Sequence, residues 1–168
     1  FIEEEKIIFN ELFKICEDKG WKLSLCTKNS KFTENSYRKN LINGNWNFVC
    51  GDKPQSSYNA VNENDIIVFT NSTLGLEALI KKKKCIAFPP DFFPFRGYNK
   101  NFTKEGPFWS CEFSKSKLKT LLEKVENLTK KEWEIIIEKY IKNIMSYDPE
   151  NKIFLSFFKK LNIEMKNE

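Results

Sequence analysis

The residues best suited to bind an anion stand in one short segment near the middle of the chain. An apolar run ends at Thr70, and Asn71 then leads into Ser72-Thr73-Leu74-Gly75. Ser and Thr are preferred helix N-caps, and a helix that starts here would turn backbone N–H groups and its dipole toward an anion, worth up to about 2 kcal/mol. A glycine in the first turn lets a phosphate or a neighbouring backbone approach closely. The segment therefore predicts a phosphate site.

Glu77 follows Thr73 by one helical turn, on the face that would border the same site. Because a carboxylate repels phosphate, we expect Glu77 to accept hydrogen bonds from ribose or sugar hydroxyls. A simpler interpretation stays open from the residues alone, in which Ser72 is only an N-cap and Glu77 is its capping partner. The segment also lacks the repeated glycines of a P-loop or a dinucleotide-binding motif.

Metal and histidine chemistry find little support in the composition. The chain has no histidine, which removes the commonest general base and the commonest zinc ligand. Its five cysteines are odd in number and widely spaced, without a Cys-x-x-Cys pair. This usage favours a reducing, cytoplasmic compartment over a disulfide framework. We therefore expect no metal ion and free thiols.

The charge of the chain argues against nucleic acid as a partner. Lys and Arg number 28 against 23 Asp and Glu, for a net charge of +5, but only Arg38 and Arg96 are arginines. Proteins that bind nucleic acid rely on arginine for base edges and phosphates. The densest basic stretch, Lys81–Lys84, is interpreted as a solvated helix end, with a membrane or polyanion patch as the alternative.

Strands and helices alternate along the chain and place the anion-binding segment at a strand end. The apolar spacing predicts strands over 21–26, 46–50, 65–70 and 85–88, and helices over 2–18, 34–41, 56–61 and 71–80. Further helices are predicted over 115–128, 131–145 and 149–161, with Thr129 and Glu132 forming a capping box. The run 65–70 is apolar without alternation, as expected for a central parallel strand covered on both faces.

This alternation predicts an α/β fold, a three-layer αβα Rossmann-like parallel sheet followed by C-terminal helices. A chain of 168 residues fits a single domain over 1–168. Ligands of open parallel sheets bind beyond the carboxyl ends of the strands, where the segment Thr70–Glu77 stands. The long aromatic loop over 88–109 has four interpretations: stacking on a base or sugar, docking against another domain, acting as a lid, or packing over the sheet edge.

The stretch Asp65–Phe88 resembles the donor-binding segment of GT-B glycosyltransferases. The shared pattern is Asp, an apolar strand, Ser-Thr-x-Gly-x-Glu-Ala-Leu, a basic turn and a second apolar strand. The likeness is closest to bacterial surface-carbohydrate biosynthesis transferases, and more distant to capsule Kdo transferases and sialyltransferases. Gly106–Ser110 and Tyr147–Asn151 resemble turns that recur in the surface-carbohydrate group. The resemblance covers roughly residues 20–160.

This resemblance implies that the chain is the C-terminal, nucleotide-sugar-binding half of a GT-B enzyme, and its start at Phe1 fits a fragment. The phosphate of a CMP- or UDP-type donor would then be held by the hydroxyls of Ser72 and Thr73 and the amides of Leu74 and Gly75, with Asn71 beside them. Glu77 would bind ribose or donor-sugar hydroxyls.

The resemblance also assigns weaker candidates at the ends of the first two strands. Gly51 and Asp52 would lie near the nucleotide base, with an ordinary Gly-Asp turn as the alternative, and Lys28 would place a cation facing the phosphate. Related transferases use a His-Pro pair near the phosphate, which this chain lacks.

The implied function is metal-independent transfer of a sugar from the nucleotide-sugar donor to a cell-surface glycan or lipid-linked acceptor. The catalytic base would come from an N-terminal half-domain outside this chain, and no residue here is assigned that role. The location would be the cytoplasm or the inner face of the membrane, with peripheral membrane contact. The alternatives are a UDP-sugar 2-epimerase-like enzyme, against which the single Glu at this place argues, and a non-catalytic binding or scaffold domain.

Overall fold

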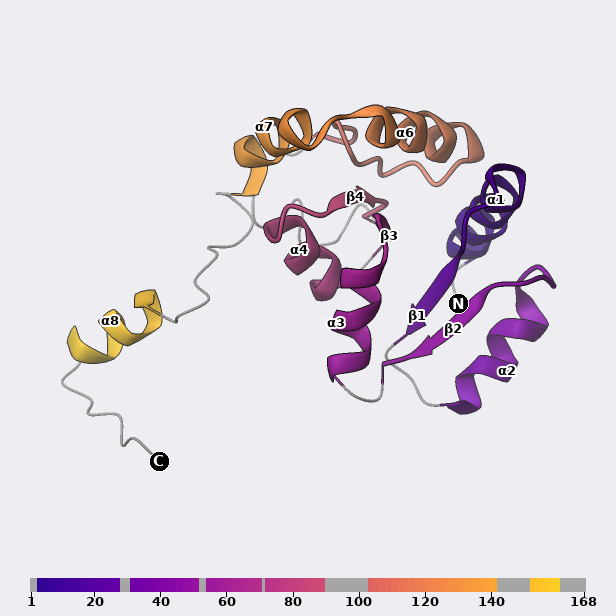
Figure 1. Ribbon diagram of the computed structural model, residues 1–168, viewed down its shortest axis with the longest axis horizontal. Helices are drawn as coiled ribbons and strands as arrows, with labels where there is room; N and C mark the ends of the chain where they lie inside the picture. The colour runs from indigo at the N-terminus through magenta and orange to yellow at the C-terminus, as the bar shows by residue number, and fades with distance from the viewer. Residues whose placement is uncertain are drawn as a thin grey trace.

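Two pairs of parallel strands form the sheet structure of the protein (Figure 1). The computed structural model describes residues 3–27, 31–51, 54–70, 72–89, 103–141 and 152–160. Strand β1 (Ser24–Thr27) pairs with β2 (Asn47–Cys50), and β3 (Ile66–Phe69) pairs with β4 (Lys84–Ala87). Within these residues the pairs form separate two-stranded sheets. The mixed α/β fold with parallel strands is therefore confirmed, whereas a continuous three-layer sheet stays a prediction.

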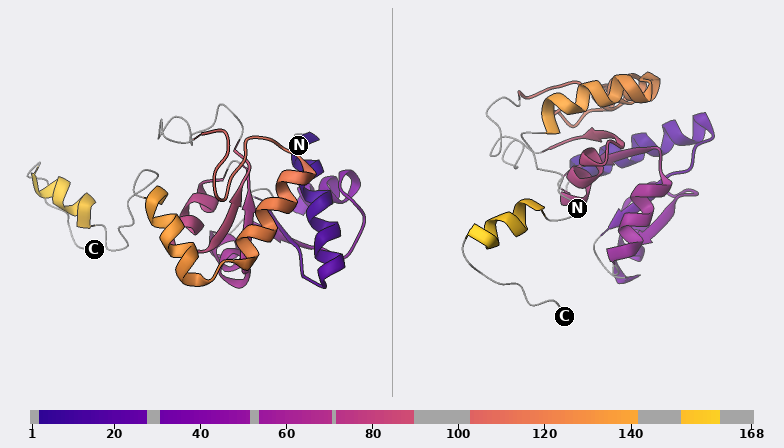
Figure 2. Two further views of the ribbon diagram at one scale, coloured as in Figure 1. Left: turned by 90° about the horizontal axis from the view of Figure 1, so that it is seen from above. Right: turned by 60° about the vertical axis from the view of Figure 1, so that its left-hand side comes forward.

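Helices connect successive strands, as parallel pairing requires. The helices are α1 (Glu3–Lys19), α2 (Lys31–Asn40), α3 (Pro54–Glu63), α4 (Thr73–Ile80), α6 (Lys115–Asn127), α7 (Lys130–Ile141) and α8 (Lys152–Lys160). Both α4 and α6 pack on β4, while α3 packs on β1 and β2. Figures 1 and 2 show α6 and α7 on one side of the β3–β4 pair, with α4 on the other. Each predicted helix and strand has a counterpart here.

One predicted strand begins later than expected, after the end of α1. The alternation predicted a strand from Trp21, but β1 starts at Ser24. Gly20 adopts φ +66° and ends α1 in a Schellman motif, in which the Trp21 N–H donates to the Cys16 carbonyl at 2.7 Å and the Gly20 N–H to the Glu17 carbonyl at 3.1 Å. The amide of Trp21 closes the helix and cannot join the strand ladder.

The most buried strand is β4, which corrects the prediction for 65–70. Cys85, Ile86 and Ala87 are fully buried, whereas Ile66, Ile67 and Val68 are only half-buried. The reason is an additional neighbour of β4. The Ala87 N–H donates to the Phe108 carbonyl at 2.9 Å, and the Ser110 N–H donates to the Ala87 carbonyl at 3.0 Å. Residues 108 and 109, predicted as the end of the aromatic loop, and Ser110 thus extend the sheet beside β4.

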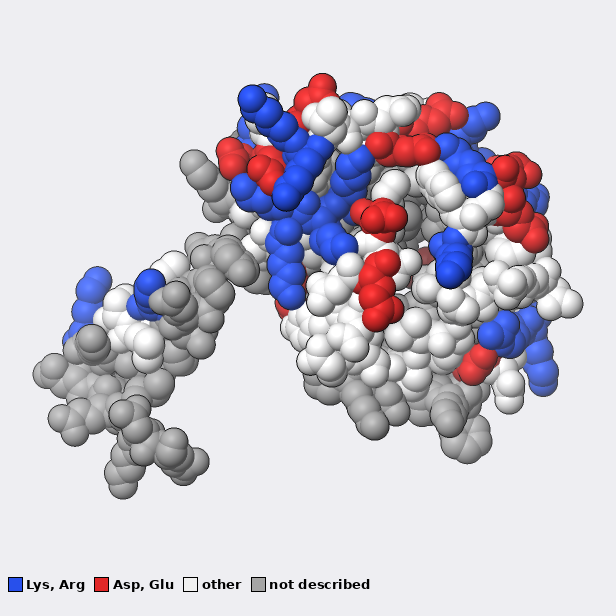
Figure 3. Space-filling model, in the orientation of Figure 1, with Lys and Arg blue, Asp and Glu red and all other residues white. Residues whose placement is uncertain are grey.

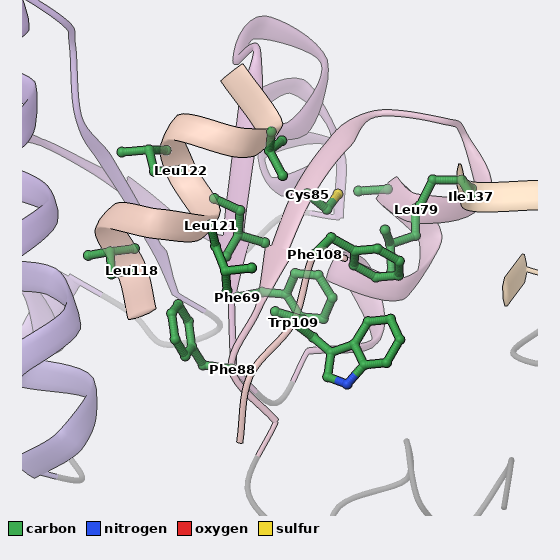
Figure 4. Close-up of a cluster of buried hydrophobic side chains, with 14 of the residues drawn as sticks. Phe69, Leu79, Cys85, Phe88, Phe108, Trp109, Leu118, Leu121, Leu122 and Ile137 are labelled. Atoms are coloured by element: carbon green, nitrogen blue, oxygen red, sulfur yellow. The ribbon is translucent and has the colours of Figure 1, made fainter. Parts of the chain in front are cut away.

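The main hydrophobic core surrounds β4 and the aromatic residues at the ends of the predicted loop (Figure 4). Phe88 and Phe108 are fully buried and Trp109 is 2% exposed. The Phe108 ring meets the rings of Trp109 and Trp133 edge-on, with centroids 4.9 and 5.6 Å apart. Phe88, Phe108 and Trp109 of the predicted loop therefore pack in the core. The other aromatics of the predicted loop (Phe92, Phe93, Phe95, Tyr98 and Phe102) lie outside the described residues, as does 147–151.

A smaller core lies under α1, around Phe9, Phe13, Leu41 and Trp46. Phe9 and Trp46 meet edge-on with centroids 5.2 Å apart. Ile8, the neighbour of Phe9 on α1, belongs to the main core. Helix α1 thus contributes apolar side chains to both cores.

The basic run Lys81–Lys84 leads from the end of α4 into β4, and its side chains have partners within the protein. Lys81 lies over the Tyr58 ring, 4.8 Å from its centroid, and Lys82 pairs with Glu138 at 3.3 Å. The Lys83 ammonium donates to two backbone carbonyls at 2.8 Å, and that of Lys84 to a third at the same distance. The prediction of a solvated helix end holds for the exposed Lys81 and Lys82, whereas Lys83 is half-buried and Lys84 belongs to β4. These contacts give the run a structural role.

The turn after α4 also anchors α7. Lys82 adopts φ +59°, and the N–H groups of Lys82 and Lys83 donate to the carbonyls of Leu79 and Ala78 in a second Schellman motif. The buried Trp133 donates from its indole Nε1 to the Lys82 carbonyl at 3.0 Å. One indole therefore ties α7 to the end of α4. The predicted capping box of Thr129 and Glu132 at the start of α7 is confirmed.

We expect Trp133→Phe to destabilise the folded chain by about 2–4 kcal/mol, because it removes a buried hydrogen bond and leaves a cavity. Trp21→Phe is the matched control, since Trp21 is 37% exposed; it should change stability by about 0.5 kcal/mol or less. Urea unfolding of both variants measures the difference. Equal midpoints would contradict the anchoring role of Trp133.

Candidate functional site

The predicted anion-binding segment forms a capped helix start immediately after β3. Ser72 is the N-cap of α4, with φ −135° and ψ 122°, and its Oγ accepts a hydrogen bond from the Gly75 N–H at 3.3 Å. Ser72 is half-buried and Thr73 is exposed. Among the described residues, no acceptor is found for the N–H groups of Thr73 and Leu74. The first turn of α4 thus holds backbone donors at the carboxyl end of a parallel strand.

Gly75 is buried and makes room for an aromatic ring. A methyl group on Gly75 would lie 2.3 Å from the ring of Phe69, the last residue of β3. The group that approaches the Gly75 Cα closely is therefore the Phe69 ring, a side chain of the core. Since the Gly75 N–H donates to Ser72, the amide and the Cα of Gly75 both serve the junction between β3 and α4.

Glu77 is held by a tyrosine from the preceding helix. The Tyr58 hydroxyl on α3 donates to Glu77 Oε2 at 2.7 Å. The interpretation of Glu77 as a capping partner is wrong, because three residues after the N-cap stands Gly75. The hydrogen bond to Glu77, the charge of that carboxylate and partial burial all raise the pKa of Tyr58, in that order. Tyr58 therefore stays protonated and donates at neutral pH.

Polar groups also meet where β1 and β2 end. The Gly51 N–H donates to the Thr27 carbonyl at 2.7 Å, and a methyl group on Gly51 would lie 2.5 Å from that oxygen and 2.7 Å from Ser57 Oγ. Thr27 Oγ1 is buried and has no partner among the described residues. Gly51 therefore lies at a strand end, as predicted. The candidates Lys28, Asp52 and Asn71 lie outside the described residues.

Two residues near these strand ends were missed by the sequence analysis. Tyr58 holds Glu77, and Glu5 on α1 accepts a hydrogen bond from Thr70 Oγ1, just after β3, at 2.7 Å. Each pair joins two elements that are distant in sequence, so residue spacing gives no signal for it. The sequence offered one indirect indication of such contacts: the predicted strand ends at Thr70, and polar side chains at the carboxyl end of a parallel strand are expected to face a ligand.

The described residues form neither a metal site nor a membrane-spanning helix. No group of three or more Cys, Asp or Glu side chains could hold a metal ion in the described part of the chain. No described helix is long and apolar enough to cross a bilayer. No disulfide joins any of the five cysteines, and burial raises the pKa of Cys16 and Cys85.

Comparison with known proteins places the chain in a family. A family model described as "putative O-antigen biosynthesis protein" matches residues 1–162. The chain belongs to this family. The match spans every described element of this O-antigen biosynthesis family member, from α1 to α8, and it indicates a role in making a surface carbohydrate. Searches of curated proteins and of solved structures found no significant match.

Gly75→Ala should destabilise the protein by about 1–3 kcal/mol, because overpacking against Phe69 outweighs the higher helix propensity of alanine. Thermal unfolding measures the effect. In a Phe69→Leu background, where the aromatic ring is absent, the same change should cost less. Equal costs in the two backgrounds would show that Phe69 does not set the requirement for glycine.

Glu77→Gln should lower the pKa of Tyr58 toward its ordinary value of about 10, because the hydrogen bond to a carboxylate becomes at most one to a neutral amide and the charge that opposes the tyrosinate is removed. Since the folded-state pKa is raised, the pair stabilises the fold below pH about 10 and loses this effect as pH rises through that pKa. Tyrosinate absorbance of wild type, Glu77→Gln and Tyr58→Phe against pH tests this. Superimposable curves for wild type and Glu77→Gln would contradict the pairing.

Proposed function

We propose that this protein is the nucleotide-sugar-binding part of a glycosyltransferase that builds O-antigen, with the donor phosphate at the start of α4. The observation that carries the proposal is the Ser72-capped first turn of α4, which follows β3 directly and has an exposed Thr73. Membership of the O-antigen biosynthesis family supports a role in surface-carbohydrate synthesis.

The chemistry of the proposed phosphate site rests on preorganised donors. The N–H groups of Thr73 and Leu74 precede the first hydrogen bond within α4, and the positive end of the helix dipole adds to them. When the bond between sugar and phosphate breaks, negative charge grows on the departing nucleotide. Fixed backbone donors stabilise that charge without reorganising, so a metal ion is not required for this step.

Glu77 and Tyr58 would recognise hydroxyls of the donor. The Tyr58 hydroxyl donates to Oε2 of the Glu77 carboxylate, and Oε1 has no hydrogen-bond partner among the described residues. A carboxylate held in this way has one oxygen available for a ribose or sugar hydroxyl. Fixing the carboxylate by a neighbouring hydroxyl reduces the entropy lost when the ligand binds.

In this proposal the chain is a Rossmann-like half of a GT-B enzyme, and the catalytic base comes from another half-domain. The acceptor is a growing glycan or a lipid-linked sugar. The parallel pairing of β3 with β4 and the polar contacts after β1, β2 and β3 agree with ligand binding at the carboxyl ends of strands.

Thermal melts with CMP, UDP, GDP and CDP test the proposal, and at least one nucleotide should raise the melting temperature of the chain. The double variant Ser72→Ala/Thr73→Ala should bind that nucleotide about tenfold more weakly or worse. The reason is that two hydroxyl ligands are lost, together with the cap that orders the amides.

The matched control is Ser114→Ala, because Ser114 caps α6 with the same φ of −135° and accepts from the Lys117 N–H at the same 3.3 Å. Removing either cap costs about 1 kcal/mol of stability, but only the change at α4 should weaken nucleotide binding. Absence of a shift with all four nucleotides would argue for a non-catalytic scaffold. Equal weakening of nucleotide binding by the control would contradict the assignment of the phosphate site to the start of α4.

A further inference from the structure

Helix α8 stands apart from the strands and the other helices. Figures 1 and 2 show this separation from several directions, and Figure 3 shows α8 with blue lysine atoms and white atoms. Two of its aliphatic side chains are open to solvent: Ile153 is 59% exposed and Leu155 is 36% exposed. An exposed apolar helix face in a folded protein marks an interaction surface.

The sequence of α8 divides sharply between apolar and basic positions. It runs Lys-Ile-Phe-Leu-Ser-Phe-Phe-Lys-Lys from 152 to 160. With 3.6 residues per turn, the polar positions 152, 156, 159 and 160 fall on one arc of the helix, and the apolar positions fill the rest. The polar arc therefore consists of three lysines and one serine.

The absence of acidic residues distinguishes α8 from every other described helix. Each of α1, α2, α3, α4, α6 and α7 contains at least one glutamate, and α8 contains neither Asp nor Glu. Elsewhere in the chain, some lysines, such as Lys82 and Lys117, pair with carboxylates, and others, such as Lys83, donate to backbone carbonyls. A basic arc without acidic residues complements a surface of negative charge.

We propose that α8 binds the surface of an anionic lipid bilayer, with its apolar arc in the boundary between headgroups and acyl chains and its lysines toward the lipid phosphates. A helix with a wide apolar face, aromatic residues and a lysine-rich polar face is typical of interfacial binding. At nine residues α8 is roughly 14 Å long, so it lies on the bilayer and does not cross it. A second copy fits less well, since paired α8 helices would bring their lysines together without any acid.

Vesicle co-sedimentation of the full chain tests this proposal. We expect binding to vesicles of equimolar phosphatidylcholine and phosphatidylglycerol, little binding to pure phosphatidylcholine, and weakening as salt is raised. Failure to bind the mixed vesicles at low salt would overturn the proposal. So would equal binding to both kinds of vesicle, since the lysines would then have no role.

Ile153→Asp should weaken vesicle binding about tenfold, because an anion replaces an aliphatic side chain that enters the bilayer in this proposal. Ile135→Asp is the matched control: Ile135 is 51% exposed on α7, and the same substitution there should leave binding unchanged. If both variants lose binding equally, binding does not depend on α8 and the proposal fails.

Lys152→Glu with Lys160→Glu is a second variant that leaves the apolar arc intact. Each lysine near an anionic surface is worth roughly fivefold in binding, so the pair should lower it by roughly 25-fold or more. Far-ultraviolet circular dichroism shows that each variant is folded. Light scattering tests the alternative that α8 binds a second copy of the chain. A dimer that Ile153→Asp disrupts, together with no vesicle binding, would assign α8 to self-association and overturn the proposal.

Discussion

The contact between Gly75 and the Phe69 ring fixes the geometry on which the candidate site depends. It sets where α4 begins relative to the end of β3, since any side chain at Gly75 would collide with the ring. The carbonyl of Phe69 also accepts from the Phe88 N–H at 2.9 Å, so the same residue links β3 to the end of β4. Ser72 and the backbone donors of the first turn are therefore positioned by packing and not by the cap alone.

The behaviour of local patterns explains which parts of the fold were predictable. Caps and periodic apolar spacing act within a few residues, so α4 with its Ser72 cap and the Thr129–Glu132 box were found from the sequence. The start of β1 was missed because a Schellman motif uses the amide of Trp21. The relative burial of β3 and β4 depends on residues 108–110 adding beside β4, which is a long-range pairing that no local pattern encodes.

The same distinction applies to the site. Residue type predicted an acceptor at Glu77, but its donor Tyr58 comes from another helix and became visible only once α3 and α4 lay side by side. Polar contacts between distant elements hold both carboxylates near the strand ends, with Glu5 joined to Thr70 in the same manner. Such contacts restrict the side-chain motion of these carboxylates. Lys81 lies over the ring of Tyr58, the residue that donates to Glu77.

The cysteines differ in a way that has a practical consequence. Cys26 is exposed on β1, beside Ser57 and the end of the strand, while Cys16 and Cys85 are buried and their pKa values are raised. Thiolate is the reactive form, so a fluorescent or spin-labelling reagent discriminates against the two buried sulfurs. Cys50 and Cys111 are half-buried, so Cys26 is the most accessible of the five thiols. It offers a natural attachment point for a reporter at the rim where a ligand is expected, without an engineered residue.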